Sequence, residues 1–329
     1  MKRHTVRTLL AAAFTLGVAL ALPGSALAQT KLKFAHVYET SEPYHKWALW
    51  AADEIKKRTA GRYEMQVFPA SQLGKETDIN QGLTLGTVDV IYTGQAFAAR
   101  TYPPLAIGGA PFMFRDLDHW KKYSHSALLE ELMDAYYKKG GNKPLAVTYY
   151  GVRHTTANKA IVKPEDMVGL KLRVPDAPLY AAYPKVLGAN ATPIAFAEVY
   201  LALQSKTVDA QENPLPTIEA KKFYEVQSHI NLTGHITEML LTIVSGQVWN
   251  KVSEADRKVF EAVFKDAAAR CTDEIAAAEQ QLVEGFVSKY KKTVVTADRA
   301  AFAARFKAFH TGPDATWDKA TYERLQAIK

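Results

Sequence analysis

The chain has 329 residues, of which 41 are Lys or Arg, 34 are Asp or Glu and 48% are apolar, a composition typical of a globular protein of one or two domains. Its single cysteine, Cys271, excludes an internal disulfide and a thiolate cluster for zinc or iron. The formal charge of +7 includes three basic residues among the first seven positions, and the remaining excess is too dilute to predict a nucleic-acid-binding surface.

The first segment is predicted to be a secretory signal peptide. Basic residues precede an apolar run at positions 9–22, and Ala26-Leu27-Ala28 fits the small-x-small cleavage rule, so the signal is assigned to residues 1–28. The apolar run is shorter than the ~20 residues needed to span a bilayer, and no cysteine follows it, which disfavours a membrane or lipid anchor. We therefore expect an exported, soluble protein that works in the periplasm.

Strands and helices alternate along the first half of the mature chain. Alternating apolar and polar residues predict a strand at 31–38, and the helix after it begins at Pro43, can be capped by Ser41 and ends at Gly61. The elements expected next are strands at 63–68, 88–93 and 145–150 and a helix at 78–85.

The same order begins again after Gly151, with a strand at 170–174 and helices at 179–187 and 197–203. This alternation predicts the α/β class, with a mainly parallel sheet and two similar halves. A helix rich in Ala, Glu, Lys and Arg is expected within 253–290, where proline is absent. Because a helix of about 30 residues extends ~45 Å, it should run across both halves.

The mature sequence contains no pattern typical of a catalytic or cofactor site. It has no G-x-S-x-G or H-E-x-x-H motif, no Walker loop and no glycine-rich dinucleotide fingerprint, and its histidines lack the close spacing of metal ligands. We therefore expect no catalytic residue, no metal and no cofactor.

Two arginines lie near the ends of predicted strands. Arg153 follows the strand at 145–150, and Arg173 lies in the strand at 170–174. Ligands of open α/β sheets gather at the carboxyl ends of strands, and a guanidinium group matches a carboxylate with two hydrogen bonds. The positions favour an organic anion as ligand, although by position alone either arginine could be solvated or paired within the protein.

Four segments in order resemble the periplasmic solute-binding subunit of tripartite ATP-independent periplasmic (TRAP) transporters, the dicarboxylate-binding-protein class. They are FPASQLGKETDINQGLTLGTVDV (68–90), YYGVRHTTANKAI (149–161), GLKLRVP (169–175) and EVYLALQSKTVDAQENP (198–214). The resemblance covers essentially the whole mature chain.

The resemblance implies a two-lobed periplasmic binding protein fold, with crossing strands and a long helix that spans both lobes. Lobe I is expected to comprise residues 29–150 and about 239–278, and lobe II residues 151–238 and about 279–329. The lobes are expected to close around an organic acid.

The resemblance also implies the ligand-binding residues. Arg173 matches the arginine that clamps the ligand carboxylate, Arg153 the arginine that supports it, and Asn213 the asparagine that hydrogen-bonds the same region. This chain has Lys206 and Ala210 where family members often have glycine, so the turn before Asn213 is expected to differ in backbone angles.

Four further residues match positions that often line the pocket. Phe196 and Asp176 belong to lobe II, whereas His36 and Glu76 are expected to reach the ligand from lobe I. Without the resemblance, Phe196 fits a core aromatic residue as well as a residue of the pocket wall. His36, Glu76 and Asp176 fit solvated or locally bonded polar residues at least as well as ligand contacts.

These features predict a non-enzymatic protein that captures a small organic acid and delivers it to the TRAP membrane subunits. The resemblance implies that those subunits drive uptake of the acid with a sodium gradient. The polar candidates of lobe I, namely His36, Glu42, Glu76, Tyr92 and Gln95, suit a sugar acid such as a uronate or aldonate, because hydroxyl groups need both donors and acceptors. The alternatives are a C4-dicarboxylate or 2-oxo acid ligand, an exported enzyme acting on an acidic sugar, and a ligand-sensing module. We expect a monomer that binds no nucleic acid.

Overall fold

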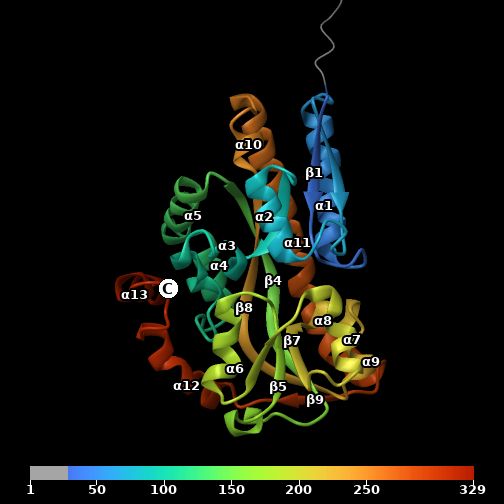
Figure 1. Ribbon diagram of the computed structural model, residues 1–329, viewed down its shortest axis with the longest axis vertical. Helices are drawn as coiled ribbons and strands as arrows, with labels where there is room; N and C mark the ends of the chain where they lie inside the picture. Colours follow the sequence, from blue (N-terminus) through green and yellow to red (C-terminus); the bar gives the residue numbers. More distant parts are fainter. Residues whose placement is uncertain (1–28) are drawn as a thin grey trace, which may run out of the picture.

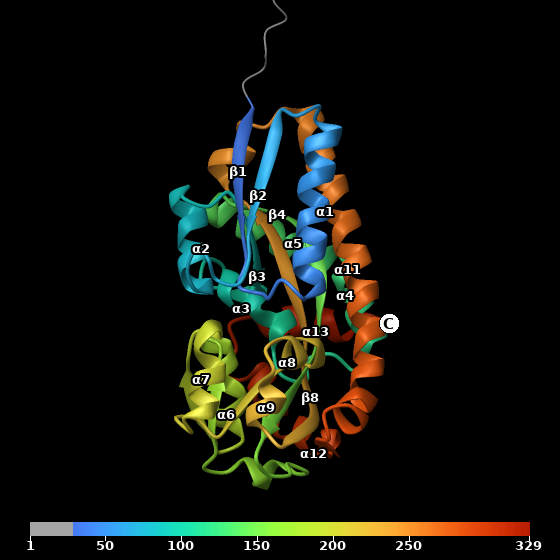
Figure 2. The same cartoon turned by 90° about the vertical axis from the view of Figure 1, so that its right-hand side faces the viewer.

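The computed structural model describes residues 29–329, so the predicted signal peptide lies outside the described residues. The described chain is elongated, with a sheet that runs along its length and helices packed on both sides (Figures 1 and 2). Among residues 29–329, no helix has both the length and the apolar character needed to cross a membrane.

A single nine-stranded sheet organises the described residues, in the order β2-β1-β3-β8-β4-β7-β5-β6, with β9 beside β8. Pairing is parallel among β1, β2 and β3 and again among β5, β6 and β7, whereas β4 and β8 run antiparallel to each other and to their other neighbours β7 and β3. The strands are β1 (Thr30–Ala35), β2 (Tyr63–Phe68), β3 (Val90–Gly94), β4 (Lys143–Ala157), β5 (Lys171–Val174), β6 (Asn190–Pro193), β7 (Ala210–Pro214), β8 (His229–Val244) and β9 (Thr293–Thr296).

The strands β4 and β8 cross from one end of the molecule to the other. They pair with each other along nearly their whole length, while β8 pairs with β3 at one end and β4 pairs with β7 at the other. The prediction that a strand ends at residue 150 was therefore wrong, because Gly151 lies at an irregularity inside a continuous strand. Its φ of 121° and the proximity of Pro214 and Glu279, each 2.7 Å from where a Cβ would be, require glycine there.

The predicted long helix is confirmed as α11 (Glu254–Ser288), whose 35 residues run along one side of the whole molecule (Figure 2). Ser253 caps it by accepting a hydrogen bond from the Asp256 N–H. Phe264 near its start and Phe286 near its end belong to two different hydrophobic cores. The helix therefore joins the two halves of the fold.

The remaining helices flank the sheet, and several of them are short. They are α1 (Pro43–Arg58), α2 (Glu76–Leu85), α3 (Gln95–Ala98), α4 (Leu117–Ser124), α5 (Ala127–Gly140), α6 (Ala182–Val186), α7 (Val199–Gln204), α8 (Leu215–Ala220), α9 (Phe223–Val226), α10 (Gly246–Trp249), α12 (Arg299–Thr311) and α13 (Lys319–Gln326). The 3₁₀ segments are Pro103–Gly109, Pro164–Met167, Pro178–Ala181 and Phe196–Glu198.

Buried apolar residues form one core around β1 to β3 in lobe I, a second around β5 in lobe II, and a third in lobe II among α7, α8 and α9. The C-terminal segment departs from the expected division at 279–329. Phe302 and Phe306 of α12 join a lobe II core, but Trp317 and Leu325 are buried in the core of lobe I. The helix α13 thus returns to lobe I, where it packs against α5. The other lobe boundaries stay a prediction.

Two polar contacts join the lobes beside the crossing strands. Lys221, just after α8, forms an ion pair with Glu39 at 2.7 Å, and the Thr217 hydroxyl donates to the Glu42 carboxylate at 2.7 Å. Glu39 and Glu42 lie between β1 and α1 in lobe I, whereas Thr217 and Lys221 belong to lobe II. These contacts tie the two lobes together at this point.

Candidate functional site

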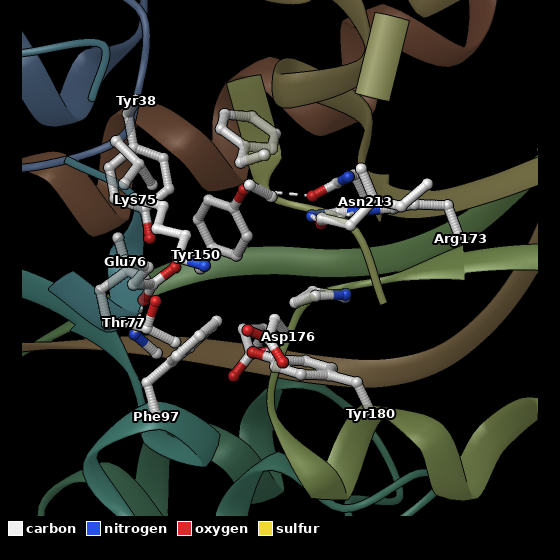
Figure 3. A pocket seen from close by; sticks show the side chains of 18 of the residues that line it. Tyr38, Lys75, Glu76, Thr77, Phe97, Tyr150, Arg173, Asp176, Tyr180 and Asn213 are labelled. Carbon is white, nitrogen blue, oxygen red and sulfur yellow. Dashed lines mark hydrogen bonds between the residues drawn. The ribbon is translucent and has the colours of Figure 1, made fainter. Parts of the chain in front are cut away.

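A cavity lies between the two lobes and encloses about 510 Å³ of space, open solvent at its mouth included (Figure 3). Lobe I, lobe II and both crossing strands contribute to its walls. The lining residues are Val37, Tyr38, Lys75, Glu76, Thr77, Gly94, Phe97, Tyr150, Arg153, Arg173, Pro175, Asp176, Tyr180, Ile194, Ala195, Phe196, Asn213, Glu238 and Leu240.

The sheet topology explains why these residues meet. The parallel strands β1 and β3 end at the cavity from lobe I, and β5 and β7 end at it from lobe II. Tyr38, Phe97 and Asp176 follow the ends of β1, β3 and β5, which is where ligands of open α/β sheets bind. The site is therefore assembled from carboxyl ends of strands that face one another across the gap between the lobes.

Arg173 is a buried cation with a free hydrogen-bond donor. Its Nε and Nη2 atoms donate to the carbonyl oxygen of Ile194 at 2.9 and 2.7 Å, while Nη1 is buried without a hydrogen-bond partner among the described residues. Burial lowers the pKa of Arg173 to about 10, which still leaves the group charged at neutral pH. Because a buried charge without a counter-ion is costly, the site is suited to an anion.

Arg153 is by contrast already paired with carboxylates of the protein. It forms a bidentate ion pair with Glu212, and its Nη1 lies 3.7 Å from Glu238. Burial alone would lower the pKa of Arg153, but the Glu212 carboxylate outweighs burial and raises it. His235 contacts the same carboxylate at 3.1 Å. We infer that the geometry suits Arg153 to hold the wall of the cavity in place.

Asn213 is fixed on the same wall by its neighbours. Its Oδ1 accepts hydrogen bonds from the Tyr150 hydroxyl and from Arg153, both at 3.3 Å, and its Nδ2 donates to Gln211 at 2.7 Å. In the turn before β7, Lys206 has a φ of 60°, the left-handed conformation that glycine adopts easily. The backbone therefore accommodates lysine there, and Asn213 reaches the cavity.

Three of the four weaker candidates also line the cavity. Glu76 is the first residue of α2, and its Oε1 accepts hydrogen bonds from the Gly94 N–H at 2.8 Å and the Thr93 hydroxyl at 2.9 Å. Burial raises its pKa, although these hydrogen bonds oppose the shift. Phe196 lies under the Lys221 ammonium, and Asp176 is part-exposed, 3.6 Å from the Arg100 guanidinium.

His36 is not among the lining residues. It is buried in lobe I, stacked on Tyr38, and one ring nitrogen contacts His45 at 3.2 Å. Burial lowers its pKa to about 3, so the ring is neutral at neutral pH. Glu42, Tyr92 and Gln95 are also absent from the lining, which leaves Glu76 as the one polar lobe I candidate of the sequence analysis that reaches the cavity.

Sequence reasoning missed several polar lining residues. Tyr38 follows β1, and Tyr150 is the last residue of the strand expected at 145–150, although it lies inside β4. The rule that identified Arg153 could therefore also have identified these two residues. Tyr180 and Glu238 carried no such signal, because Glu238 lies inside β8 and Tyr180 inside a 3₁₀ segment. Among residues 29–329, no cluster of three or more His, Cys, Asp or Glu is arranged to hold a metal ion.

Comparison with known proteins shows a family match over most of the chain. The model of bacterial extracellular solute-binding protein, family 7, matches residues 34–312. The sialic acid-binding periplasmic protein SiaP of Vibrio cholerae is 34% identical over 270 residues, 82% of this chain and 84% of that protein. The 2,3-diketo-L-gulonate-binding periplasmic protein YiaO of Escherichia coli is 31% identical over 299 residues, 91% of this chain and 90% of that protein.

Solved structures of TRAP periplasmic solute-binding proteins share the fold. One from Polaromonas, bound to D-erythronate, has a TM-score of 0.85 at 34% identity and covers 92% of this chain and 99% of its own. One from Roseobacter denitrificans with bound L-galactonate has a TM-score of 0.83 at 30% identity, covering 91% and 98%. One from Sulfurospirillum deleyianum with bound succinate has a TM-score of 0.84 at 28% identity, covering 91% and 99%.

Proposed function

The chain belongs to family 7 of the bacterial extracellular solute-binding proteins, and we propose that it captures a sugar acid in the cavity between its lobes for a TRAP transporter. It is a periplasmic solute-binding protein, and its two-lobed fold with a long helix is that of its structural relatives.

The observation that carries the proposal is the state of Arg173. The residue is 2% exposed, its guanidinium group is held in place by the Ile194 carbonyl, and one buried nitrogen of that group has no partner among the described residues. A ligand carboxylate would supply both the missing acceptor and the missing counter-charge. We assign to Arg173 the role of clamping this carboxylate, with Arg153 and Asn213 as its support.

The remaining lining suits the hydroxyl groups of a sugar acid. The Tyr38, Tyr150 and Tyr180 hydroxyls, with the Asn213 amide and the Glu76 carboxylate, offer both donors and acceptors. The bound aldonates D-erythronate and L-galactonate in structural relatives support this ligand class. A C4-dicarboxylate is the second candidate, supported by the succinate-bound relative.

Closure of the lobes would complete binding. The Glu39–Lys221 and Glu42–Thr217 contacts join the lobes beside the cavity, and water exclusion strengthens the ion pair to Arg173. The closed protein then presents one surface to the membrane subunits, which we expect to take up the acid with a sodium gradient. We propose that it acts as a monomer and does not transform its ligand.

A thermal-shift and calorimetric screen tests the proposal. Aldonates, uronates, succinate and 2-oxoglutarate are compared with galactitol, which has the hydroxyl groups of L-galactonate but no carboxylate. A bound acid at 100 times its dissociation constant stabilises the fold by ~2.7 kcal/mol, and galactitol should not stabilise it. Equal binding of galactitol, or no binding of any acid, would refute the proposal. Recovery of a chemically altered ligand would instead support an exported enzyme.

A further inference from the structure

Glu238 is a buried acid in the cavity wall that the proposed function does not use. It lies in the crossing strand β8, is 1% exposed, and lines the cavity. Its Oε2 accepts a hydrogen bond from the Tyr180 hydroxyl at 2.9 Å, whereas its Oε1 is buried without a hydrogen-bond partner among the described residues. A buried carboxyl oxygen without a donor is costly, so a group within the cavity is expected to satisfy it.

The cations near Glu238 are already engaged or remote. The nearest, Arg153, forms its bidentate pair with Glu212 and lies 3.7 Å from Glu238. Lys75 also lines the cavity, but it is exposed, so water screens its charge. Glu212 and Glu238 therefore share the Arg153 guanidinium group, and the charge of the Glu76 carboxyl group also acts on Glu238.

This charge distribution differs from that at Arg173. Figure 3 shows Arg173 and Glu76 on opposite sides of the cavity, and Tyr180, which bonds to Glu238, below them in the view. One side therefore offers a cation without an ion-pair partner, and the side around Glu238 offers carboxyl and hydroxyl oxygens beside the already paired Arg153. Such a cavity is complementary to a molecule with one carboxylate and several hydroxyl groups.

We propose that Glu238 determines ligand selectivity: its free carboxyl oxygen accepts a hydrogen bond from a ligand hydroxyl, and its charge excludes a second carboxylate. The inference rests on the proposed function, because it assumes that Arg173 holds the first carboxylate. It deepens that function by restricting the ligand to monoacids with several hydroxyl groups.

The pKa of Glu238 sets the pH range of this role. Burial raises the pKa to about 7, while Arg153 and the Tyr180 hydroxyl limit the rise, so the carboxyl group is only part-ionised at neutral pH and carries most of its charge above about pH 8. The charged groups that face Glu238 are Arg153 from β4, Glu212 from β7 and Glu76 from α2. A second ligand carboxylate would add a further negative charge to a site where ionisation is already unfavourable.

The test compares two six-carbon acids that differ at one end, L-galactonate and galactarate, in which the terminal CH₂OH is a second carboxylate. Calorimetry on the wild-type protein at about pH 8.5, where Glu238 is ionised, should give at least about tenfold tighter binding of galactonate. The Glu238→Gln variant keeps the side-chain shape and one acceptor oxygen but loses the charge. It should reduce the galactonate preference at least about fivefold, mainly through tighter binding of galactarate.

The control is Glu279→Gln. Glu279 accepts hydrogen bonds from the Val152 N–H and the Tyr149 hydroxyl, both at 2.6 Å, but does not line the cavity, so its variant should keep the wild-type preference. Equal wild-type affinity for the two acids overturns the inference without any variant, as does an unchanged preference in a folded Glu238→Gln protein. If the wild type binds neither these acids nor others, the proposed function itself fails.

Discussion

Replacing Arg173 by alanine is the sharpest perturbation of the proposed ligand site. The substitution removes the buried guanidinium group together with its free Nη1 donor and its two hydrogen bonds to the Ile194 carbonyl. Alanine leaves the ligand carboxylate in a closed cavity with no cation opposite it. Arg173→Lys is the informative companion, because it keeps a positive charge but cannot form the two-point contact.

The expected loss of binding free energy follows from the burial of the Arg173 guanidinium group. Truncation of one partner of a buried, hydrogen-bonded charge pair costs about 2–5 kcal/mol, which corresponds to about 30- to 5,000-fold in Kd. The cost should lie toward the upper part of this range, because Arg173 is 2% exposed and solvent cannot easily replace it. The Kd of the Arg173→Lys protein should lie between that of the Arg173→Ala protein and that of the wild type.

The assay is calorimetric titration of L-galactonate into wild-type and variant proteins whose folding has been verified by circular dichroism. Arg305→Ala serves as the matched control, because Arg305 is an exposed lobe II arginine paired with Glu165. Its affinity should equal that of the wild type. A folded Arg173→Ala protein that binds galactonate within about threefold of the wild type would refute the reasoning, since a charged contact of this kind is worth far more.

Two further predictions concern stability. Arg153→Ala leaves the buried carboxylates of Glu212 and Glu238 without their cation, so the free energy of unfolding in urea should fall by about 3–5 kcal/mol, whereas Arg305→Ala should change it by less than ~1 kcal/mol; equal losses would contradict the buried-pair argument. Burial raises the pKa of Glu42 from its ordinary 4.5 to about 7, so the folded wild type retains a proton that the unfolded chain releases and loses stability as pH rises through this window. The stability of Glu42→Gln relative to the wild type should therefore increase from pH 4.5 to 7, by at most ~1.4 kcal/mol per pH unit, and a difference that is flat between urea titrations at pH 5 and 7.5 would refute this assignment.

The local pattern of the chain was a good guide to its elements. The absence of proline between residues 253 and 290 predicted the helix α11. The prediction succeeded because helix propensity and capping by Ser253 depend on residues that are close in sequence. The same local view failed at Gly151, where a turn residue lies inside a strand. The bend there depends on the approach of Pro214 and Glu279, which are distant in sequence.

Strand ends likewise indicated the region of the site but not the state of each residue. Arg153 and Arg173 have similar positions in sequence, yet one is paired with Glu212 and the other retains a buried nitrogen without a partner. His36 also follows a strand, but its side chain packs inside lobe I and does not line the cavity. No periodicity reveals which side of a strand end faces the opposite lobe.

The sequence by itself determined the α/β class, the long helix, the family resemblance and the position of Arg173 near the carboxyl end of a strand, because each of these is recorded in neighbouring residues. The tertiary structure decided which arginine is left without a counter-ion, that Glu238 lines the cavity, and that α13 returns to lobe I. Those features depend on contacts between residues far apart in the chain. Burial then sets the free-energy cost of each unpaired charge, because the same charge is stabilised by water at the surface and is not stabilised by water between the lobes.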